Sequence, residues 1–454
     1  MKQLRKTFFL CMVLLPTSWG MDKTTVQQLI DMANSQSFAL QKAITSTFDP
    51  KDLKDGTAWI GRGSDFFFAV DAKSQPLLFI DDAAGPDMKH AAGSNLWYAA
   101  AHIEPTGRLH SFHYTLEGAR LGGRLDMPAY GPLSYRQPGV PSGLLSAKIT
   151  HSSKIYDGMK SQYSVYVPAQ YDPKIPAALM VFQDGSWYTD RNGWYTGSNG
   201  NIPIIDAIDN LIAKKKIPVM ICVFIDPGDI TDSPGTQTYA FAKAYAEKWH
   251  RKLKDSMRST LYDTVSDRYP RFLRDEILVE VESKYNIRKD AYSRAIAGQS
   301  SGGICSFNAA WWMPELFSRV ISWIGSFESI QWKENNNAPD GGQDYPNKIL
   351  RERKRNIRVW LQDGSNDAEN EEYGSWPLAN LRMANALKMK GYDFHFSFGK
   401  GTHNPAHGAA EFPQEMIWLW RDYDPNKTDQ TFTTDPSEAV EPVFRVQVIN
   451  RNFE

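Results

Sequence analysis

The sequence predicts a mixed α/β protein in two parts, an antiparallel β-sandwich followed by a larger domain built on a mostly parallel sheet. The chain has 454 residues, several times the roughly 100–200 residues of a typical domain. Short alternating apolar segments dominate its first third, whereas apolar runs alternate with helix-like stretches after about residue 145. Fourteen tryptophans and an aromatic content of 13% are typical of an ordered globular chain.

The charge balance argues against a nucleic-acid partner. Lysine and arginine number 51 against 52 aspartates and glutamates, and the formal net charge is −1, so the chain has no strong field of one sign. Three cysteines are too few for a disulfide scaffold. Cys222 and Cys305 are predicted to be buried free thiols.

Residues 1–20 have the three parts of an export signal. Basic residues precede an apolar run at 8–15, and Ser18 and Gly20 take the −3 and −1 positions of a cut after Gly20. A membrane anchor is the weaker alternative, because the run is shorter than the roughly 20 residues that span a bilayer. We therefore expect a periplasmic or secreted protein with no integral membrane segment after cleavage.

Residues 21–119 are predicted to form a β-sandwich of the immunoglobulin type. A short helix is expected around residues 24–35. The strand-like segments that follow are closely spaced and separated by glycine, proline and aspartate; they are 58–60, 65–70, 76–80, 96–100 and 109–114. Residues 120–144, rich in glycine and proline, predict a linker.

The second domain is expected over residues 145–423. Its strand-like runs are 161–168, 178–183, 217–225, 293–298, 318–323, 357–361 and 392–398. Its helix-like stretches are 204–214, 267–285, 302–312, 377–390 and 411–421. This repeated alternation indicates a mostly parallel sheet with helices on both faces.

A candidate nucleophile lies at one strand-to-helix junction. The motif Gly298-x-Ser300-x-Gly302 follows an apolar strand and precedes an apolar helix, and its glycines let a serine occupy a sharp turn with the hydroxyl exposed. The backbone N–H of Ser301 would then face the oxygen that becomes negative during acyl transfer. An ordinary glycine-rich loop is the alternative.

A serine hydroxyl needs a base to take its proton, and three histidines follow Ser300 in the chain. His395 lies in an alternating strand and is given a surface or packing role. His403 and His407 lie in the next loop; we favour His403 and keep His407 as the alternative. Their spacing would suit a zinc pair on a helix, but Pro405 interrupts such a helix, so no metal is expected.

The carboxylate that orients the histidine should follow the strand at 357–361. The loop there offers Asp363, Asp367 and Glu369. Asp367 is favoured because it lies clear of the strand, and Asp363 stays the alternative. An Asx turn would explain either aspartate without catalysis.

A second oxyanion donor is expected after the strand at 178–183. The amide of Gly185 is nominated, because glycine lets the backbone approach a ligand closely. Trp187 and Tyr188 in the same loop are candidates for binding an aromatic or sugar-bearing substrate. They are equally suited to a buried core.

Four motifs together resemble the "Putative esterase" family of α/β-hydrolases, which includes enterochelin (ferric enterobactin) esterases, family 1 carbohydrate esterases such as feruloyl esterases, and esterase D. The motifs are Val181–Gly185, Gly298–Gly303, Leu361–Asp367 and Gly401–Gly408. The likeness covers roughly residues 145–423. It leaves 424–454 as an extension without an assigned role.

The resemblance implies an α/β-hydrolase fold in which Ser300, Asp367 and His403 take the nucleophile, acid and base positions. It is closest to the enterochelin-esterase-like branch, whose members often carry an N-terminal immunoglobulin-like domain. The implied protein is an exported serine esterase without a cofactor, acting on a siderophore-type or hydroxycinnamoyl or acyl ester.

Two alternatives stay open. One is a feruloyl or acetyl esterase that acts on plant polysaccharide, and the other is a non-catalytic carbohydrate- or siderophore-binding protein on a hydrolase scaffold. The N-terminal sandwich is expected to recognise the substrate and to supply no catalytic group, since every group that acyl transfer needs is found between Gly185 and His403.

Overall fold

A computed structural model describes residues 24–103, 107–189, 204–229, 257–331, 334–335, 338–339, 341–371 and 373–440. The predicted export signal lies outside these residues, as does the end of the C-terminal extension. Among the helices in these ranges, none is long and apolar enough to cross a lipid bilayer.

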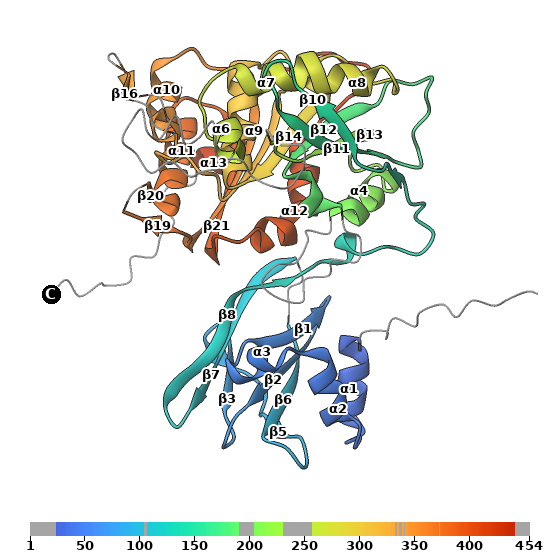
Figure 1. Cartoon of the computed structure of the whole chain (residues 1–454), viewed down its shortest axis with the longest axis vertical. Coiled ribbons are helices and arrows are strands. Elements are labelled where there is room, and N and C mark those ends of the chain that lie inside the picture. Colours follow the sequence, from blue (N-terminus) through green and yellow to red (C-terminus); the bar gives the residue numbers. More distant parts are fainter. Residues whose placement is uncertain are drawn as a thin grey trace, which may run out of the picture.

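The N-terminal part consists of three helices and two four-stranded sheets whose paired strands run antiparallel (Figure 1). The helices are α1 (Val26–Asn34), α2 (Leu40–Thr47) and α3 (Pro50–Lys54). One sheet has the order β1 (Ala58–Arg62), β2 (Asp65–Asp71), β6 (Leu96–His102), β5 (Lys89–His90). The other has the order β4 (Ala83–Ala84), β3 (Leu77–Ile80), β7 (Arg108–Leu116), β8 (Ala119–Ala129).

The predicted helix near residues 24–35 is confirmed as α1, which begins with a capping box made by Thr25 and Gln28. The two sheets contact each other through their aromatic side chains. The rings of Phe68 on β2 and Phe112 on β7 lie 4.9 Å apart in an edge-on arrangement. Neighbouring Phe67 points the other way and packs with α1 and α2, as strand alternation requires.

The second sheet is longer than the sequence predicted. The expected linker begins at residue 120, yet β8 stays paired with β7 as far as Ala129. Gly122 and Gly123 have positive φ values of 58° and 110° and lie where the strand register shifts, so these glycines form irregularities within the strand instead of ending it.

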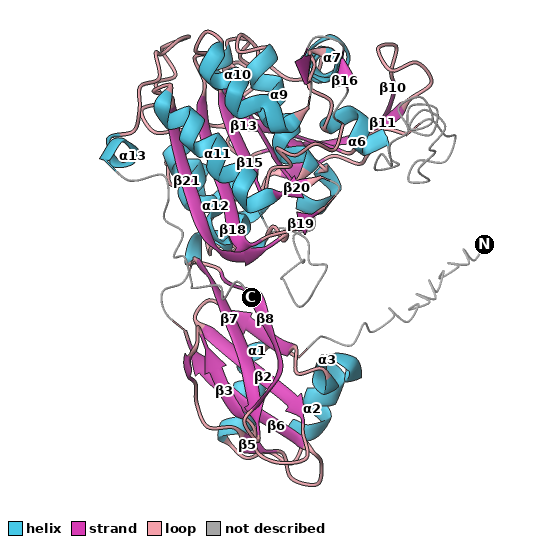
Figure 2. Cartoon of the chain, turned by 90° about the vertical axis from the view of Figure 1, so that its left-hand side faces the viewer, coloured by secondary structure: helices cyan, strands magenta, loops and turns pink. Residues whose placement is uncertain are grey.

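A nine-stranded sheet forms the centre of the second part (Figure 2). Its order is β10-β11-β13-β12-β14-β15-β18-β21, with β9 also paired to β11. The strands from β13 to β21 in this order pair in parallel, and β9, β10 and β11 join the edge antiparallel. The bounds are β9 Leu144–Leu145, β10 Ile149–Ser152, β11 Lys160–Val167, β12 Ala178–Gln183, β13 Met220–Ile225, β14 Arg294–Gln299, β15 Arg319–Trp323, β18 Arg358–Asn366 and β21 Asp393–Thr402. The expectation of a mixed α/β fold with a mostly parallel sheet is confirmed.

Helices cover both faces of this sheet. Leu179 and Val181 of β12 belong to one buried cluster, and Met180 and Phe182 belong to another, because successive side chains point to opposite faces. One face packs against α4 (Ile204–Ala213) and α12 (Ala406–Leu419). The other packs against α6 (Met257–Tyr262), α7 (Arg268–Phe272), α8 (Leu278–Glu282), α9 (Ser301–Trp312), α10 (Tyr345–Arg351) and α11 (Trp376–Met389).

Short elements complete the described chain. They are the short strands β16 (Glu334–Asn335), β17 (Ala338–Pro339), β19 (Glu369–Asn370) and β20 (Gly374–Ser375), helix α13 (Pro436–Val440), and the single turns η1 (Pro132–Ser134), η2 (Gly185–Tyr188), η3 (Leu273–Ile277), η4 (Ala291–Ser293) and η5 (Gly342–Asp344).

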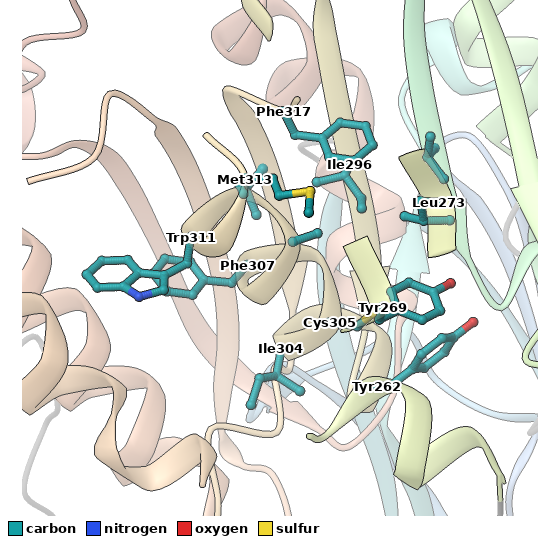
Figure 3. Close-up of a cluster of buried hydrophobic side chains, with 14 of the residues drawn as sticks. Tyr262, Tyr269, Leu273, Ile296, Ile304, Cys305, Phe307, Trp311, Met313 and Phe317 are labelled. Atoms are coloured by element: carbon teal, nitrogen blue, oxygen red, sulfur yellow. The ribbon is translucent and has the colours of Figure 1, made fainter. Parts of the chain in front are cut away.

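Helix α9, which follows the candidate nucleophile, is buried over nearly its whole length. Figure 3 shows Ile304, Phe307 and Trp311 of this helix in the buried cluster that also contains Tyr262 and Tyr269 from the neighbouring helices. Cys305 lies in the same cluster, and Cys222 is buried in β13. Both are free thiols, as predicted.

The N-terminal sheets and the second part of the chain share a hydrophobic cluster. It includes Phe68 of β2, Met127 of β8, Phe224 of β13 and Phe412 of α12. Figures 1 and 2 show the ends of β7 and β8 reaching the region where β21 ends and α12 begins. The N-terminal part is therefore packed directly against the elements that carry the C-terminal motifs.

Candidate active site

Ser300 occupies a strained turn between β14 and α9. Its φ of 55° and ψ of −123° are unusual for a residue with a side chain. The glycines around it are sterically required, because a Cβ on Gly298 would lie 2.3 Å from the carbonyl oxygen of Gly302. The backbone N–H of Ser300 donates to the Trp323 carbonyl at 2.9 Å, which fixes the turn against β15.

The structure brings three of the predicted residues into one chain of hydrogen bonds. Ser300 Oγ lies 2.8 Å from Nε2 of His403, and Nδ1 of His403 lies 2.5 Å from Oδ1 of Asp367. The Asp367 side chain is fully buried, whereas the His403 side chain keeps 33% of its surface exposed. An imidazole that donates from Nδ1 has Nε2 free to accept the serine proton.

The strand ends explain why these three residues meet. Ser300 directly follows β14, Asp367 directly follows β18 and His403 directly follows β21. Because these strands belong to one parallel series, their carboxyl ends lie along one edge of the sheet, where ligands bind in open α/β sheets.

Asp363, the alternative acid, lies behind Asp367 and not against His403. It is fully buried, and its Oδ1 accepts from the backbone N–H of Gly364 at 2.7 Å. Burial, followed by the hydrogen bond and negative charge of Asp367, raises the pKa of Asp363 well above its usual range. This buried position therefore favours the neutral form of the Asp363 carboxyl group beside Asp367.

The other two histidines have different partners. Nδ1 of His407, on α12, lies 3.0 Å from Gln362 Nε2, and its Nε2 lies 3.1 Å from Glu411 Oε1. His395 stacks on Trp360 with ring centroids 4.1 Å apart, which confirms its predicted packing role. The structure thus places His403 against Ser300 and His407 in a buried polar network.

Gly185 and Ser301 are each the first residue of a helical segment, η2 and α9. Backbone N–H groups in the first turn have no acceptor within their own helix and can bind an anion. A Cβ on Gly185 would lie 2.2 Å from the Phe224 carbonyl carbon on β13. Glycine is therefore required for η2 to approach the sheet this closely.

An ion pair that the sequence analysis did not find joins these two segments. Nε and Nη2 of Arg258 donate to the two carboxylate oxygens of Asp184, each at 2.7 Å. Nη2 also lies 3.4 Å from the carbonyl oxygen of Gln299. Arg258 thus connects the residue before Gly185 to the residue before Ser300.

Of the two aromatic residues proposed for substrate binding, one is exposed and the other is buried. Trp187 is 51% exposed and lines a cavity of about 330 Å³ together with Lys148, Asp226 and Arg258. Tyr188 is only 1% exposed. The substrate-binding role predicted for Tyr188 is wrong, because its ring packs in the core against Phe182 and cannot face a ligand.

Two further side chains at the nucleophile had no signal in the sequence. Ser326 Oγ lies 3.2 Å from Ser300 Oγ and accepts a hydrogen bond from Trp376 Nε1 at 3.0 Å. The Trp376 ring lies edge-on to His403, with centroids 5.5 Å apart. Ser326 lies 26 positions from Ser300 and 50 positions from Trp376, so the fold, and no local motif, brings these side chains together.

Glu328 adds a third carboxyl group near the site. It lies two residues after Ser326 and is 5% exposed. Burial, with a smaller contribution from the charge of Asp367, raises the pKa of Glu328 to about 8. The side chain is therefore mostly neutral at pH 7 and limits the negative charge beside Asp367.

A comparison with protein-family models gives one match over the second part of the chain. The model described as "Putative esterase" matches residues 153–419, which is more than half of the sequence. The matched segment contains Ser300, Asp367 and His403.

The solved structures that resemble this chain include enterobactin esterases and ferulic acid esterases. The enterobactin esterase of Shigella flexneri has 16% identity and a TM-score of 0.49, covering 79% of this chain and 93% of that chain. The ferric enterobactin esterase of Salmonella typhimurium has 15% identity and a TM-score of 0.47, with the same coverage of 79% and 93%. The ferulic acid esterase of Anaeromyces mucronatus has 16% identity and a TM-score of 0.44, covering 65% and 96%.

Proposed function

Because the chain belongs to the "Putative esterase" family, we propose that it is a serine carboxylic-ester hydrolase of the α/β-hydrolase fold with Ser300 as nucleophile, His403 as base and Asp367 as the orienting acid. The observation that carries the proposal is the hydrogen-bonded series from Ser300 Oγ through His403 to Asp367. Each member then has the partner that its role requires.

In the proposed reaction, Ser300 Oγ attacks the ester carbonyl carbon while His403 Nε2 takes the hydroxyl proton. His403 returns this proton to the leaving alcohol oxygen, and the acyl group stays on Ser300. A water molecule, deprotonated by His403, then attacks the acyl carbon; the bond to Ser300 Oγ breaks, His403 returns the proton to this oxygen, and the acid is released. Asp367 stabilises the imidazolium in both steps.

We assign the oxyanion hole to the backbone N–H groups of Ser301 and Gly185. Their places at the first residues of α9 and η2 support this assignment. The Arg258–Asp184 ion pair supports it further by tying the Gly185 segment to the end of β14. Pre-positioned donors of this kind stabilise developing charge without reorganising during the reaction.

For the substrate we propose a siderophore-type, hydroxycinnamoyl or simpler acyl ester. A feruloyl or acetyl esterase acting on plant polysaccharide is the alternative, and a non-catalytic binding protein is the second. We keep Trp187 as the proposed substrate contact, since it is exposed beside the Gly185 segment.

We further propose that the N-terminal sheets form an immunoglobulin-type sandwich, and that residues 1–20 direct export to the periplasm or the medium. Production of the full chain in a bacterial host tests export. Cleavage after Gly20 with recovery outside the cytoplasm supports it, and an uncleaved cytoplasmic chain contradicts it.

A panel of three esters tests for esterase activity and distinguishes the proposed substrate classes. We expect hydrolysis of p-nitrophenyl acetate, together with a larger kcat/KM on either methyl ferulate or a catechol siderophore lactone. Preference for the lactone supports the siderophore version, and preference for the ferulate supports the polysaccharide version. A folded protein that hydrolyses none of the three would contradict the esterase proposal and favour the binding-protein alternative.

Replacing Asp367 by asparagine is expected to lower kcat by about 10⁴-fold, because an amide no longer fixes the tautomer or stabilises the charge of His403. Asp363→Asn is the matched control in the same loop. Asparagine keeps an oxygen that can accept from the Gly364 N–H, and Asp363 makes no hydrogen bond to His403 in the described structure, so we expect a much smaller loss. Steady-state kinetics on p-nitrophenyl acetate compare the two; equal losses would contradict the assignment of Asp367 as the acid.

A further inference from the structure

The strand end that carries His403 is held by a carboxylate from the N-terminal part. Asp126 lies on β8 and Thr402 is the last residue of β21. Asp126 Oδ1 accepts from the backbone N–H of Thr402 at 2.9 Å, and Oδ2 accepts from the Thr402 hydroxyl. Since Thr402 directly precedes His403, both bonds act one residue away from the proposed base.

A second contact sits beside this one. A Cβ on Gly401 would lie 3.2 Å from Cδ2 of Leu109 on β7 and 3.4 Å from Asp126 Oδ1. The backbone at the end of β21 therefore lies directly on the two strands β7 and β8. Figures 1 and 2 show these strand ends meeting.

The opposite side of the same segment is tied to the loop that carries Asp367. Nδ2 of Asn366 donates to the carbonyl oxygen of Lys400 at 2.7 Å. The end of β21 is thus held between the N-terminal sheet and the residue just before the proposed acid. Thr402 is also paired with Asn366 in the β18–β21 ladder, so loss of the Asp126 contacts leaves the segment before His403 held from the β18 side alone.

We propose that Asp126 is a positioning residue for acyl transfer, through which the N-terminal sheet sets the place of His403 relative to Ser300 and Asp367. This inference rests on the proposed function. It replaces the expectation that the N-terminal sandwich serves recognition alone. A displacement of a reacting group by about 1 Å can cost about 10²-fold in rate, so a loosened strand end should affect chemistry more than substrate binding.

The test compares Asp126→Ala with Asp126→Asn in the full chain, using p-nitrophenyl acetate. The alanine variant loses both acceptors and should show a kcat lower by about 10- to 100-fold, with KM changed little. The asparagine variant should recover most of kcat, because its Oδ1 can accept from the Thr402 N–H and its amide can pair with the Thr402 hydroxyl. The rate of inactivation by a fluorophosphonate should fall in parallel with kcat.

Asp82→Ala is the matched control. Asp82 also reaches the same segment from the N-terminal sheet, with Oδ2 3.4 Å from Lys400 Nζ, but the side chains of Asp82 and Lys400 are 68% and 73% exposed. Such exposed pairs contribute little, so this variant should keep the wild-type kcat.

Thr402→Val provides a milder second variant in case Asp126→Ala does not fold. It removes the hydroxyl but keeps the backbone N–H, so a smaller drop in kcat is expected, with recovery in Thr402→Ser. Wild-type kcat in folded Asp126→Ala, or in Thr402→Val where the first variant does not fold, would overturn the inference. Ser300→Ala, measured in the same assay, separates the two claims. An active Ser300→Ala variant would contradict the proposed function. An inactive Ser300→Ala variant together with a fully active Asp126→Ala variant would contradict only the positioning role.

Discussion

Replacing Ser300 by alanine is expected to lower kcat for ester hydrolysis by about 10⁶-fold, the cost of losing a triad nucleophile. Ser326 Oγ, 3.2 Å away, accepts a hydrogen bond from Trp376 Nε1 that holds it in place, so we do not expect it to replace the missing nucleophile. The fold should survive, since the change removes one oxygen from a half-buried side chain. Initial rates on p-nitrophenyl acetate and a thermal melt measure both effects.

Ser301→Ala is the control for this change. Ser301 is fully buried at the start of α9, and its proposed contribution is a backbone N–H that alanine retains. We expect kcat within a few-fold of the wild type. Substantial activity in Ser300→Ala, or an equal loss in Ser301→Ala, would contradict the assignment of the nucleophile.

Replacing His403 by alanine should be about as damaging as replacing Ser300, again about 10⁶-fold in kcat, because members of a triad act as a unit. The nucleophile then keeps its hydroxyl but loses His403, the base that lies 2.8 Å from it. Exogenous imidazole offers a further readout: partial recovery of activity is expected if the missing group is a base.

His407→Ala should affect stability more than catalysis. Its ring packs on Gly399 and faces Gln362 and Glu411, so its loss takes this partner from the buried Gln362 amide, at about 1–3 kcal/mol. A lower melting temperature with kcat within a modest factor is expected. The reverse pattern would exchange the two histidines, and inactivation of the wild type by EDTA would revive the zinc alternative.

The elements that the sequence predicts well are those whose pattern is local. The apolar runs of β12, β14 and β15 and the glycines around Ser300 are local signals, and they are enough to predict the strands and the strand-to-helix turn. The sequence could not predict which of Trp187 and Tyr188 is exposed, because this depends on contacts between segments that are distant in the chain. Adjacent aromatic residues carry the same local signal, and only the packing of η2 against β13 decides which one is buried.

The contacts made by Asp126 could not be predicted from the sequence either, because they join segments that are far apart in the chain. In the sequence it lies among the glycines and prolines of the predicted linker, and 276 positions separate it from Thr402. Its strand continues through Gly122 and Gly123, which adopt positive φ values within it. From composition alone, these glycines predict the end of a strand and the start of a linker. Asp363 was likewise ambiguous, since its burial behind Asp367 depends on the pairing of β18 with β15 and β21.

Labelling with a fluorophosphonate, followed by mass spectrometry of the intact chain and its peptides, tests the central proposal most directly. The reagent forms a stable bond only with a serine activated by a neighbouring base. We expect one adduct per chain, located on Ser300, with loss of activity in proportion to labelling and no adduct in His403→Ala. An active enzyme that stays unlabelled at Ser300, or one inactivated by an adduct on another residue, would contradict the proposal.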